Sequence, residues 1–218
     1  MKCWDSLDHL FSYLNGTNAE YLVLRNWELL NGSSSVASKH LDIDFLCRDR
    51  ESFITHIGSI SNANNTDQIH QRIKVGDHFL RVDLRTINDG YYDKTWEEDM
   101  LKNRILFDEK INVMDKKNYF YSLLYHAHIQ KKTLADDYRI KLTSLAHELD
   151  IDYNEGNWAD LLNSFMYANH YSYTFPEYKG AYVDFSQVDK RLIKHSYYRE
   201  LRRKIYSFKR KLIRSIKK

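Results

Sequence analysis

Two aspartates one residue apart, Asp42 and Asp44, are the residues of this sequence best suited to metal chemistry. They lie in the run His-Leu-Asp-Ile-Asp-Phe-Leu at residues 40–46, in which apolar residues alternate with the acids. In a β-strand, residues i and i+2 point to the same face, so both carboxylates would project side by side. Carboxylates held that close repel each other unless a cation lies between them. Such oxygen ligands suit Mg²⁺ or Mn²⁺, and Mg²⁺ is commonly bound by one or two carboxylates together with substrate phosphates.

A third acid, Asp83, lies on a second predicted strand, residues 78–84, whose other face is apolar. Three acids on neighbouring strands are typical of two-metal phosphoryl transfer, in which one ion activates an acceptor hydroxyl and another neutralises the donor phosphates. We therefore predict that Asp42, Asp44 and Asp83 are catalytic metal ligands. Asp83 would hold the second ion or accept the proton of the acceptor hydroxyl. Catalysis of this kind depends mostly on positioning and charge stabilisation.

Each acid also has a structural interpretation. Asp42 and Asp44 would then be solvated acids on an edge strand, and Asp83 would pair with Arg81 or Arg85. The apolar residues that flank the acids, and the similar pattern of the two strands, favour the metal site over this alternative.

The elements that must position these acids follow from the apolar pattern and the turn residues. A 3.6-residue apolar period predicts helices, and short apolar or alternating runs predict strands. In the first half we expect a helix at 4–15, strands at 21–24 and 41–47, a polar loop at 31–39, a helix at 48–57, and a hairpin of strands 68–75 and 78–84. In the second half we expect helices at 94–103, 115–132, 134–149, 157–170 and 187–216.

The expected fold class is α+β. Residues 1–93 would form an α/β domain around a mixed β-sheet with flanking helices, 94–186 an all-α helical region, and 187–218 a basic amphipathic C-terminal helix. The length of 218 residues and a hydrophobic content of 43% suffice for a packed core. Only 7 Gly and 1 Pro argue against a loop-rich chain.

The order of these elements resembles the nucleotidyltransferase superfamily, the DNA polymerase β-like fold. Its pattern is a strand, a turn that opens a helix, a strand with alternating hydrophobic residues and acids, and a third acid on a later strand. The resemblance covers residues 18–90, and Asp42, Asp44 and Asp83 match the three acids. It implies Mg²⁺ or Mn²⁺ as the cofactor and a nucleoside triphosphate or another phosphorylated donor as a substrate.

One segment departs from the family pattern. The glycine-containing turn after the first strand is replaced by Leu-Arg-Asn-Trp-Glu at 24–28, and a Gly-Ser pair lies farther along, at 32–33. We predict that Arg25 and Asn26 occupy the turn. A guanidinium suits phosphate oxygens, but Arg25 could equally form a salt bridge with an acid of the site. We expect the polar loop to contact the donor phosphates as well. The contacts would come from Ser33, Ser34, Ser35 and Lys39.

Two segments also resemble small nucleotidyltransferase-like proteins found with bacterial surface-polysaccharide genes: residues 24–44 and the helical run at 119–128. The resemblance implies metal-dependent transfer of a nucleotidyl or substituted phosphoryl group to a small-molecule, sugar or glycan acceptor. There are three alternatives to this function. The protein could belong to the choline/ribitol phosphotransferase branch, be a catalytically inactive module of the same fold, or be a nucleotidyltransferase-type antitoxin. A glycosyltransferase with an Asp-x-Asp motif is disfavoured, because only 41 residues precede Asp42.

Composition predicts the compartment. The two cysteines, Cys3 and Cys47, lack metal-ligand spacing and exclude a disulfide framework. The charged N-terminal residues do not form a signal peptide, and no apolar run is long enough for a membrane span. We expect a cytoplasmic protein.

Charge is distributed unevenly along the chain. Residues 190–218 contain 13 Lys or Arg and one acid, whereas residues 1–189 contain 20 Lys or Arg and 29 acids. Apolar residues recur near helical spacing in 187–218. This tail would bind the anionic inner face of a membrane, close a helical bundle with its charges in water, or bind nucleic acid. We favour the membrane. Nucleic acid is not an expected partner, because the acidic body would repel it.

Overall fold

The computed structural model describes residues 2–30, 42–61, 68–178, 180–194, 201, 204–206 and 208. The chain divides into two compact units, residues 1–87 with 97–119, and residues 88–96 with 120–218. Two of the three divisions fall within helices α3 (Lys94–Lys102) and α4 (Lys116–Ile129), so each of these helices has residues in both units.

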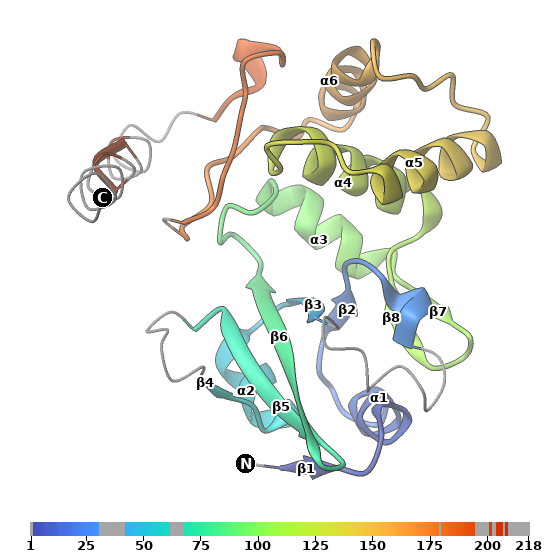
Figure 1. Cartoon of the computed structure of the whole chain (residues 1–218), viewed down its shortest axis with the longest axis vertical. Helices are drawn as coiled ribbons and strands as arrows, with labels where there is room; N and C mark the ends of the chain where they lie inside the picture. The colour runs from blue at the N-terminus through green and yellow to red at the C-terminus, as the bar shows by residue number, and fades with distance from the viewer. Residues whose placement is uncertain are drawn as a thin grey trace. The chain divides into compact units, whose positions relative to one another are not determined.

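The first unit is built on a mixed β-sheet (Figure 1). Its described strands are β1 (Cys3–Trp4), β2 (Tyr21–Val23), β3 (Asp42–Cys47), β4 (Ile60–Ser61), β5 (His70–Val75), β6 (His78–Thr86), β7 (Ile105–Phe107) and β8 (Ile111–Val113). Their order is β1-β5-β6-β3-β2-β8-β7, with β4 paired to β5. β3 is antiparallel to β2 and parallel to β6, so the two predicted acid-bearing strands are direct neighbours.

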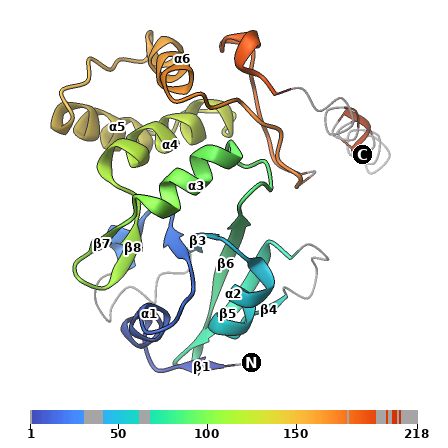
Figure 2. The same ribbon diagram turned by 180° about the vertical axis from the view of Figure 1, so that it is seen from behind.

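Helices α1 (Leu7–Asn15) and α2 (Arg50–Ile57) pack against one face of this sheet. The ring centroid of Phe45 on β3 lies 6.4 Å from that of Phe11 on α1 and 5.1 Å from that of Phe53 on α2. α2 lies behind β5 and β6 in Figure 1 and in front of them in Figure 2. Ile43 and Phe45 on β3, with their register partners Val82 and Leu84 on β6, face these helices, and the residues that alternate with them face the other way.

Two residues, 48 and 49, connect β3 to α2, and local residues fix both ends of this helix. Asp49 is the N-cap, and its side chain accepts a hydrogen bond of 2.6 Å from the Ser52 amide. Gly58 ends the helix with φ 64°, where a Cβ atom would lie 2.5 Å from that of Lys2. β3 is thus held against the helical layer from its C-terminal end.

β5 and β6 form the hairpin that the sequence predicts, with Gly76 at φ 55° in the turn. The buried residues of β5 alternate with polar ones, and the same holds for most of β6. The antiparallel register pairs His70 with Asp83 and Arg72 with Arg81. Because paired residues share a face, these four side chains lie on the polar side of the sheet.

The α+β class agrees with the sequence prediction, but the prediction of an all-α region for 94–186 is wrong at residues 105–113. There β7 and β8 form a hairpin that joins the sheet beside β2. Asp108 and Glu109 make the turn with φ of 49° and 56°. Two-residue turns of this kind usually carry Asn-Gly or Asp-Gly. Without that glycine, and with strands of only three residues, the local pattern gives no strand signal.

The second unit is helical around an aromatic core. Helices α5 (Asp136–Glu148) and α6 (Trp158–Ala168) accompany the part of α4 that follows Tyr119, close to the predicted bounds. The rings of Trp96 and Tyr171 stack with centroids 5.6 Å apart, and those of Tyr121 and Phe165 stack at 3.8 Å. Tyr121 therefore packs in the aromatic core of this unit.

The predicted helix at 187–216 is not α-helical from 187 to 194. Lys190–Leu192 form a short 3-10 helix, η3, capped by the side chain of Asp189. The amide of Lys194 then donates a hydrogen bond of 2.9 Å to the carbonyl of Tyr173, which holds this segment extended. Residues 201, 204–206 and 208 are helical, and the remainder of the predicted tail helix lies outside the described residues.

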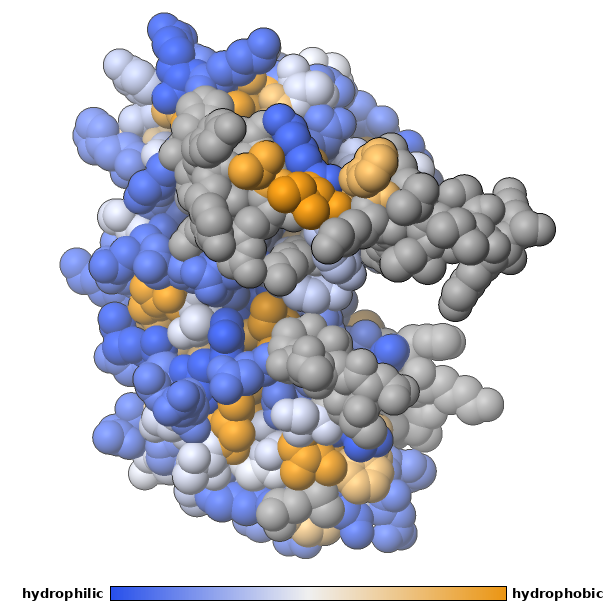
Figure 3. All heavy atoms as spheres, turned by 90° about the vertical axis from the view of Figure 1, so that its left-hand side faces the viewer, coloured by the Kyte–Doolittle hydropathy of each residue, from blue (hydrophilic) through white to orange (hydrophobic). Residues whose placement is uncertain are grey.

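No helix in the described part of the chain is long and apolar enough to cross a membrane. On the face drawn in Figure 3, hydrophobic residues lie singly or in small groups among hydrophilic ones. Scattered exposure of this kind is normal for a protein surface and does not by itself mark a binding site.

Candidate active site

Asp44 on β3 and Asp83 on β6 are direct register partners. The two strands are parallel, and the same register pairs Asp42 with Arg81. Partners on neighbouring strands project from one face, with backbones about 4.8 Å apart. Asp42 lies two residues before Asp44 and projects from the same face, about 7 Å along the strand. The fold thus brings the three predicted acids to one patch of the sheet.

The carboxylate of Asp44 is bound by Arg25. The distance from Arg25 Nη2 to Asp44 Oδ2 is 2.8 Å, and the two side chains are only 7% and 17% exposed. A guanidinium this deeply buried is stabilised by an anionic partner. The salt bridge that was one of the two expected roles of Arg25 is therefore present.

Asn26 gives the turn after β2 its shape. Its φ of 59° lies in the left-handed region, which Gly adopts freely and Asn tolerates better than most residues. The chain then enters a 3-10 helix, η1 (Trp27–Leu30), to which Tyr119 is joined by a 3.3 Å hydrogen bond from its hydroxyl to Glu28 Oε1. Arg25 and Asn26 occupy the turn as predicted, with Asn in a conformation that usually requires glycine.

Asp42 lies at the start of β3 and is 45% exposed. Its Oδ1 atom is 2.8 Å from Nε of Arg81. The sequence left open, as the structural alternative, that Asp83 pairs with Arg81 or Arg85, but Arg81 instead pairs with Asp42. The register places Arg81 opposite Asp42, within reach of that carboxylate.

Asp83 is a largely buried acid beside two other carboxylates. Burial raises the pKa of Asp83, and the charges of Asp44 and Asp42 raise it further, while His70 and Arg85 act in the opposite direction. His70 Nε2 lies 3.9 Å from Asp83 Oδ1. A cation near these carboxylates would relieve their mutual repulsion.

Three basic residues of β5 also lie on this face, although they were not predicted as site residues. His70 is the partner of Asp83, Arg72 is the partner of Arg81, and Lys74 follows on the same face. Their signal in the sequence is the alternation His-Gln-Arg-Ile-Lys-Val at 70–75. That alternation becomes informative only when the register shows which residues it places beside the acids.

Among the described residues, no three His, Cys, Asp or Glu side chains form a group that could hold a metal ion. The carboxylates of Asp42 and Asp44 instead bind guanidiniums. Carboxylate oxygen is the ligand type that Mg²⁺ and Mn²⁺ take, and the three carboxylates project from one face, but they are not gathered around a common point. Metal binding would require Asp42 and Asp44 to exchange their arginine partners for the cation. The expected phosphate loop of Ser33, Ser34, Ser35 and Lys39 lies outside the described residues.

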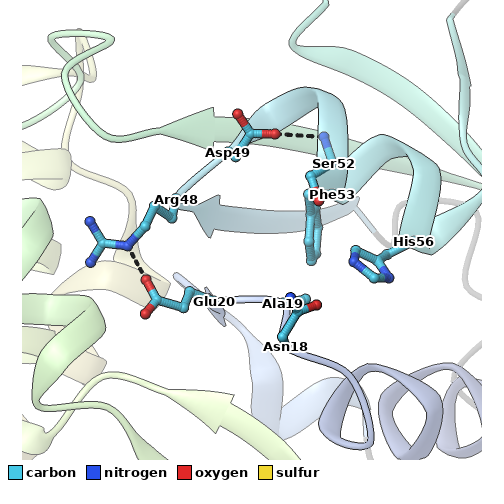
Figure 4. A pocket seen from close by; sticks show the side chains of 8 residues that line it. All are labelled: Asn18, Ala19, Glu20, Arg48, Asp49, Ser52, Phe53 and His56. Carbon is cyan, nitrogen blue, oxygen red and sulfur yellow. Dashed lines mark hydrogen bonds and ion pairs between the residues drawn. The ribbon is translucent and has the colours of Figure 1, made fainter.

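A hollow of about 190 Å³ lies at the other end of β3 (Figure 4). It is lined by Asn18, Ala19, Glu20, Arg48, Asp49, Ser52, Phe53 and His56. Arg48 forms an ion pair with Glu20, and the side chain of Asp49 caps α2. Arg48 is four residues beyond Asp44, roughly 13 Å along an extended strand. The hollow is therefore separate from the three acids, and Arg48 and Glu20 in its lining neutralise each other.

Comparison with known proteins adds little evidence about the activity to what this geometry provides. No family model and no curated protein matches the sequence. The chain is similar to the solution structure of the antibiotic-resistance factor ANT(2'')-Ia, an aminoglycoside nucleotidyltransferase, with 11% sequence identity and a TM-score of 0.40. The similarity covers 74% of this chain and 89% of that one. A likeness of this size assigns no activity, so the chemistry of the side chains must carry the functional proposal.

Proposed function

We propose that the first unit carries the active site of a metal-dependent nucleotidyltransferase-type enzyme. It transfers a nucleotidyl or substituted phosphoryl group from a nucleoside triphosphate or another phosphorylated donor to a small-molecule, sugar or glycan acceptor. The observation that carries the proposal is the register of β3 and β6, in which Asp83 is opposite Asp44 and Asp42 shares their face. A role in surface-polysaccharide synthesis is the narrower form of the proposal and rests on the sequence resemblance.

In this proposal Asp42, Asp44 and Asp83 hold Mg²⁺ or Mn²⁺. The bound metal supplies positive charge to the donor phosphates and lowers the pKa of the acceptor hydroxyl. Arg25 lies beside Asp44 at the end of β2, where its planar guanidinium suits phosphate oxygens of the donor. Asp83, opposite Asp44 on the neighbouring strand, either holds the second ion or accepts the proton of the acceptor hydroxyl.

A second candidate function is a non-catalytic module that binds a nucleotide, a sugar or a partner chain. The observation that favours it is the pairing of Arg25 with Asp44 and of Arg81 with Asp42. Ion pairs of this kind can join β2, β3 and β6 without any metal. The two candidates differ in whether a divalent cation binds to the acids.

Thermal unfolding tests the two candidates without knowledge of the acceptor. Nucleoside triphosphates, nucleotide sugars and CDP-alcohols are added with Mg²⁺ or Mn²⁺ to the full chain, to the double variant Asp42→Asn/Asp44→Asn and to Asp77→Asn. Asp77 lies in the β5–β6 turn and serves as the matched control. We expect a donor at about 100 times its Kd to raise the Tm by about 5–10 °C in the wild type and in Asp77→Asn, but not in the double variant.

The donor found in this way is then used to screen sugar and glycan acceptors for product formation. If no donor raises the Tm in a metal-dependent manner, the catalytic proposal fails and the non-catalytic candidate remains. If the double variant responds like the wild type, a nucleotide binds elsewhere and the three acids are not its metal site.

A further inference from the structure

The polar face of the β5–β6 hairpin carries a group of positive charges with no role in the proposed metal site. Arg72, Lys74 and Arg81 are its members, and we call them the basic strip. Arg72 and Lys74 alternate with buried residues on β5, and Arg81 on β6 is the cross-strand partner of Arg72. Residues opposed in this way have Cβ atoms about 5 Å apart. Three cationic side chains therefore gather beside the acids.

This arrangement is unfavourable in isolation, because like charges opposite each other destabilise an antiparallel pair. Arg81 is partly neutralised by Asp42, with Nε and Oδ1 2.8 Å apart. Arg72 lies over the ring of Phe79, with its guanidinium carbon 5.3 Å from the ring centroid. Among the described residues, Nε of Arg72 is buried and makes no hydrogen bond. An anion bound between Arg72 and Arg81 would offset the repulsion and supply acceptor oxygens.

The sheet order indicates which substrate reaches the basic strip. In the order β5-β6-β3-β2, the three acids occupy the two middle strands. The turn of Arg25 and Asn26, where the proposed donor phosphates bind, follows β2 on one side of the acids. The strip extends away from the acids on the other side: Arg81 is on β6 beside Asp42, and Arg72 and Lys74 are on β5 beyond it. A transfer reaction needs its donor and acceptor on different sides of the metal, so the strip faces the acceptor.

We propose that the basic strip binds a phosphate-monoester group of the acceptor, so that the second substrate is a phosphorylated sugar or polyol. This inference rests on the proposed function, because it assigns the strip to the second substrate of that same site. A phosphate monoester carries close to two negative charges near neutral pH and offers three strong acceptor oxygens. It can therefore be shared by two guanidiniums and an ammonium, whereas a neutral or cationic acceptor would leave their repulsion uncompensated.

Asp42 links the strip to the metal site. It binds Arg81, and the proposed function assigns the same carboxylate to the metal. When Asp42 is neutralised, Arg81 becomes a donor for the phosphate. Asp42→Asn is therefore expected to bind a phosphate monoester at least as tightly as the wild type, although it loses a metal ligand.

Calorimetric titration of the full chain with glucose 1-phosphate and glycerol 3-phosphate, without metal or nucleotide, tests the proposal. Glucose and glycerol are the uncharged counterparts, and Lys102→Gln on α3 is the control variant. We expect both phosphates to bind and both uncharged compounds not to bind. Arg72→Gln/Lys74→Gln should weaken binding about tenfold or more, because a hydrogen bond to a charged group is worth about that factor. Lys102→Gln should bind like the wild type.

Several results would overturn the proposal. One is that neither phosphate ester binds, and another is that Arg72→Gln/Lys74→Gln and Lys102→Gln bind the esters with equal affinity. A third is that Asp42→Asn binds the esters more weakly than the wild type. The last is that inorganic phosphate binds as tightly as the esters. The last result would mean that the strip binds a phosphate group but makes no contact with the sugar or polyol of an acceptor. Unfolding curves of each variant confirm that it is folded.

The outcome is separable from that of the proposed function. Asp42→Asn/Asp44→Asn should lose the metal-dependent Tm increase by nucleoside triphosphates and keep the binding of sugar phosphates. If donors stabilise the wild type with metal but neither phosphate monoester binds, this inference fails and the proposed function stands. If Arg72→Gln/Lys74→Gln removes only the stabilisation by donors, the strip serves the donor and the inference also fails.

Discussion

Asn26 is the residue on which the turn after β2 depends, because its φ is 59°. For residues other than Gly and Asn, this conformation costs about 1–2 kcal/mol. We expect Asn26→Ala to lower the free energy of unfolding by about 1 kcal/mol, and Asn26→Gly to change it by less than about 0.5 kcal/mol. Urea unfolding at 25 °C measures both. Asn103→Ala is the control at an exposed position outside the left-handed region, and an equal loss in Asn26→Ala and Asn103→Ala would contradict this explanation.

His128 gives the second unit a pH dependence. Its ring stacks on Trp158 with centroids 4.5 Å apart, and burial lowers the pKa of His128 to about 4. The unfolded chain takes up a proton near the ordinary pKa of 6.5 and the folded chain only near 4, so stability is lost as the pH falls through this range. The full shift corresponds to about 3 kcal/mol, and partial exposure reduces the expected effect to about 1–2 kcal/mol.

His128→Phe keeps a ring on Trp158 and removes the titrating group. The free energy of unfolding in urea should therefore fall less between pH 7 and pH 4.5 in this variant than in the wild type, by about 1–2 kcal/mol. The same fall in both proteins would show that His128 does not titrate as its burial indicates.

Among the elements of the first unit, the β7–β8 hairpin is the main one that the local sequence does not predict. Its turn holds Asp108 and Glu109 in left-handed conformations, which are unfavourable for both residues. We expect Asp108→Asn/Glu109→Gly to raise the free energy of unfolding by about 1 kcal/mol, because Asn-Gly suits this turn. Asp108→Ala/Glu109→Ala keeps the unfavourable backbone and should not stabilise. Equal stability of the two double variants in urea would contradict this account of the turn.

Most other elements of the first unit were predictable because each has its own local signal. The two-residue strands β1 and β4 were not predicted, and Trp4 of β1 was placed in the first helix. Ser6 and Asp49 cap α1 and α2, Gly76 turns the β5–β6 hairpin, and alternating residues mark β3 and β6. The pairing of β3 with β6 has no local signal, since more than 30 residues separate the two strands in the chain. It depends on both strands burying their apolar faces against α1 and α2, which is a property of the assembled unit.

At the scale of the whole molecule, charge separates the chain into an acidic body and a basic tail. Residues 190–218 carry 13 Lys or Arg and one acid. Three apolar side chains near the end of the described tail are exposed, with Leu201 at 41%, Ile205 at 48% and Phe208 at 67%. Apolar and cationic residues together are typical of segments that lie on anionic lipid, where each basic residue adds about 1 kcal/mol.

We therefore expect the full chain to pellet with phosphatidylglycerol vesicles at low salt, and not with phosphatidylcholine vesicles. The triple variant Leu201→Ser/Ile205→Ser/Phe208→Ser should bind about tenfold or more weakly, because each buried apolar side chain contributes about 1.5–3 kcal/mol. Ile140→Ser is the control, since Ile140 is 70% exposed on α5 and lies outside the tail. Failure of the wild type to pellet at low salt would remove the membrane from the expected partners.

The sequence by itself determined the three acids, the strands that carry them, the turn at Arg25 and Asn26, and most helices, because these depend on residue type and short-range periodicity. The tertiary structure decided which residues meet: Asp44 with Asp83 and Arg25, Asp42 with Arg81, and Arg72 with Arg81. Register and side-chain pairing depend on long-range packing of the sheet against its helices. For that reason the basic strip beside the acids is visible only in the folded chain.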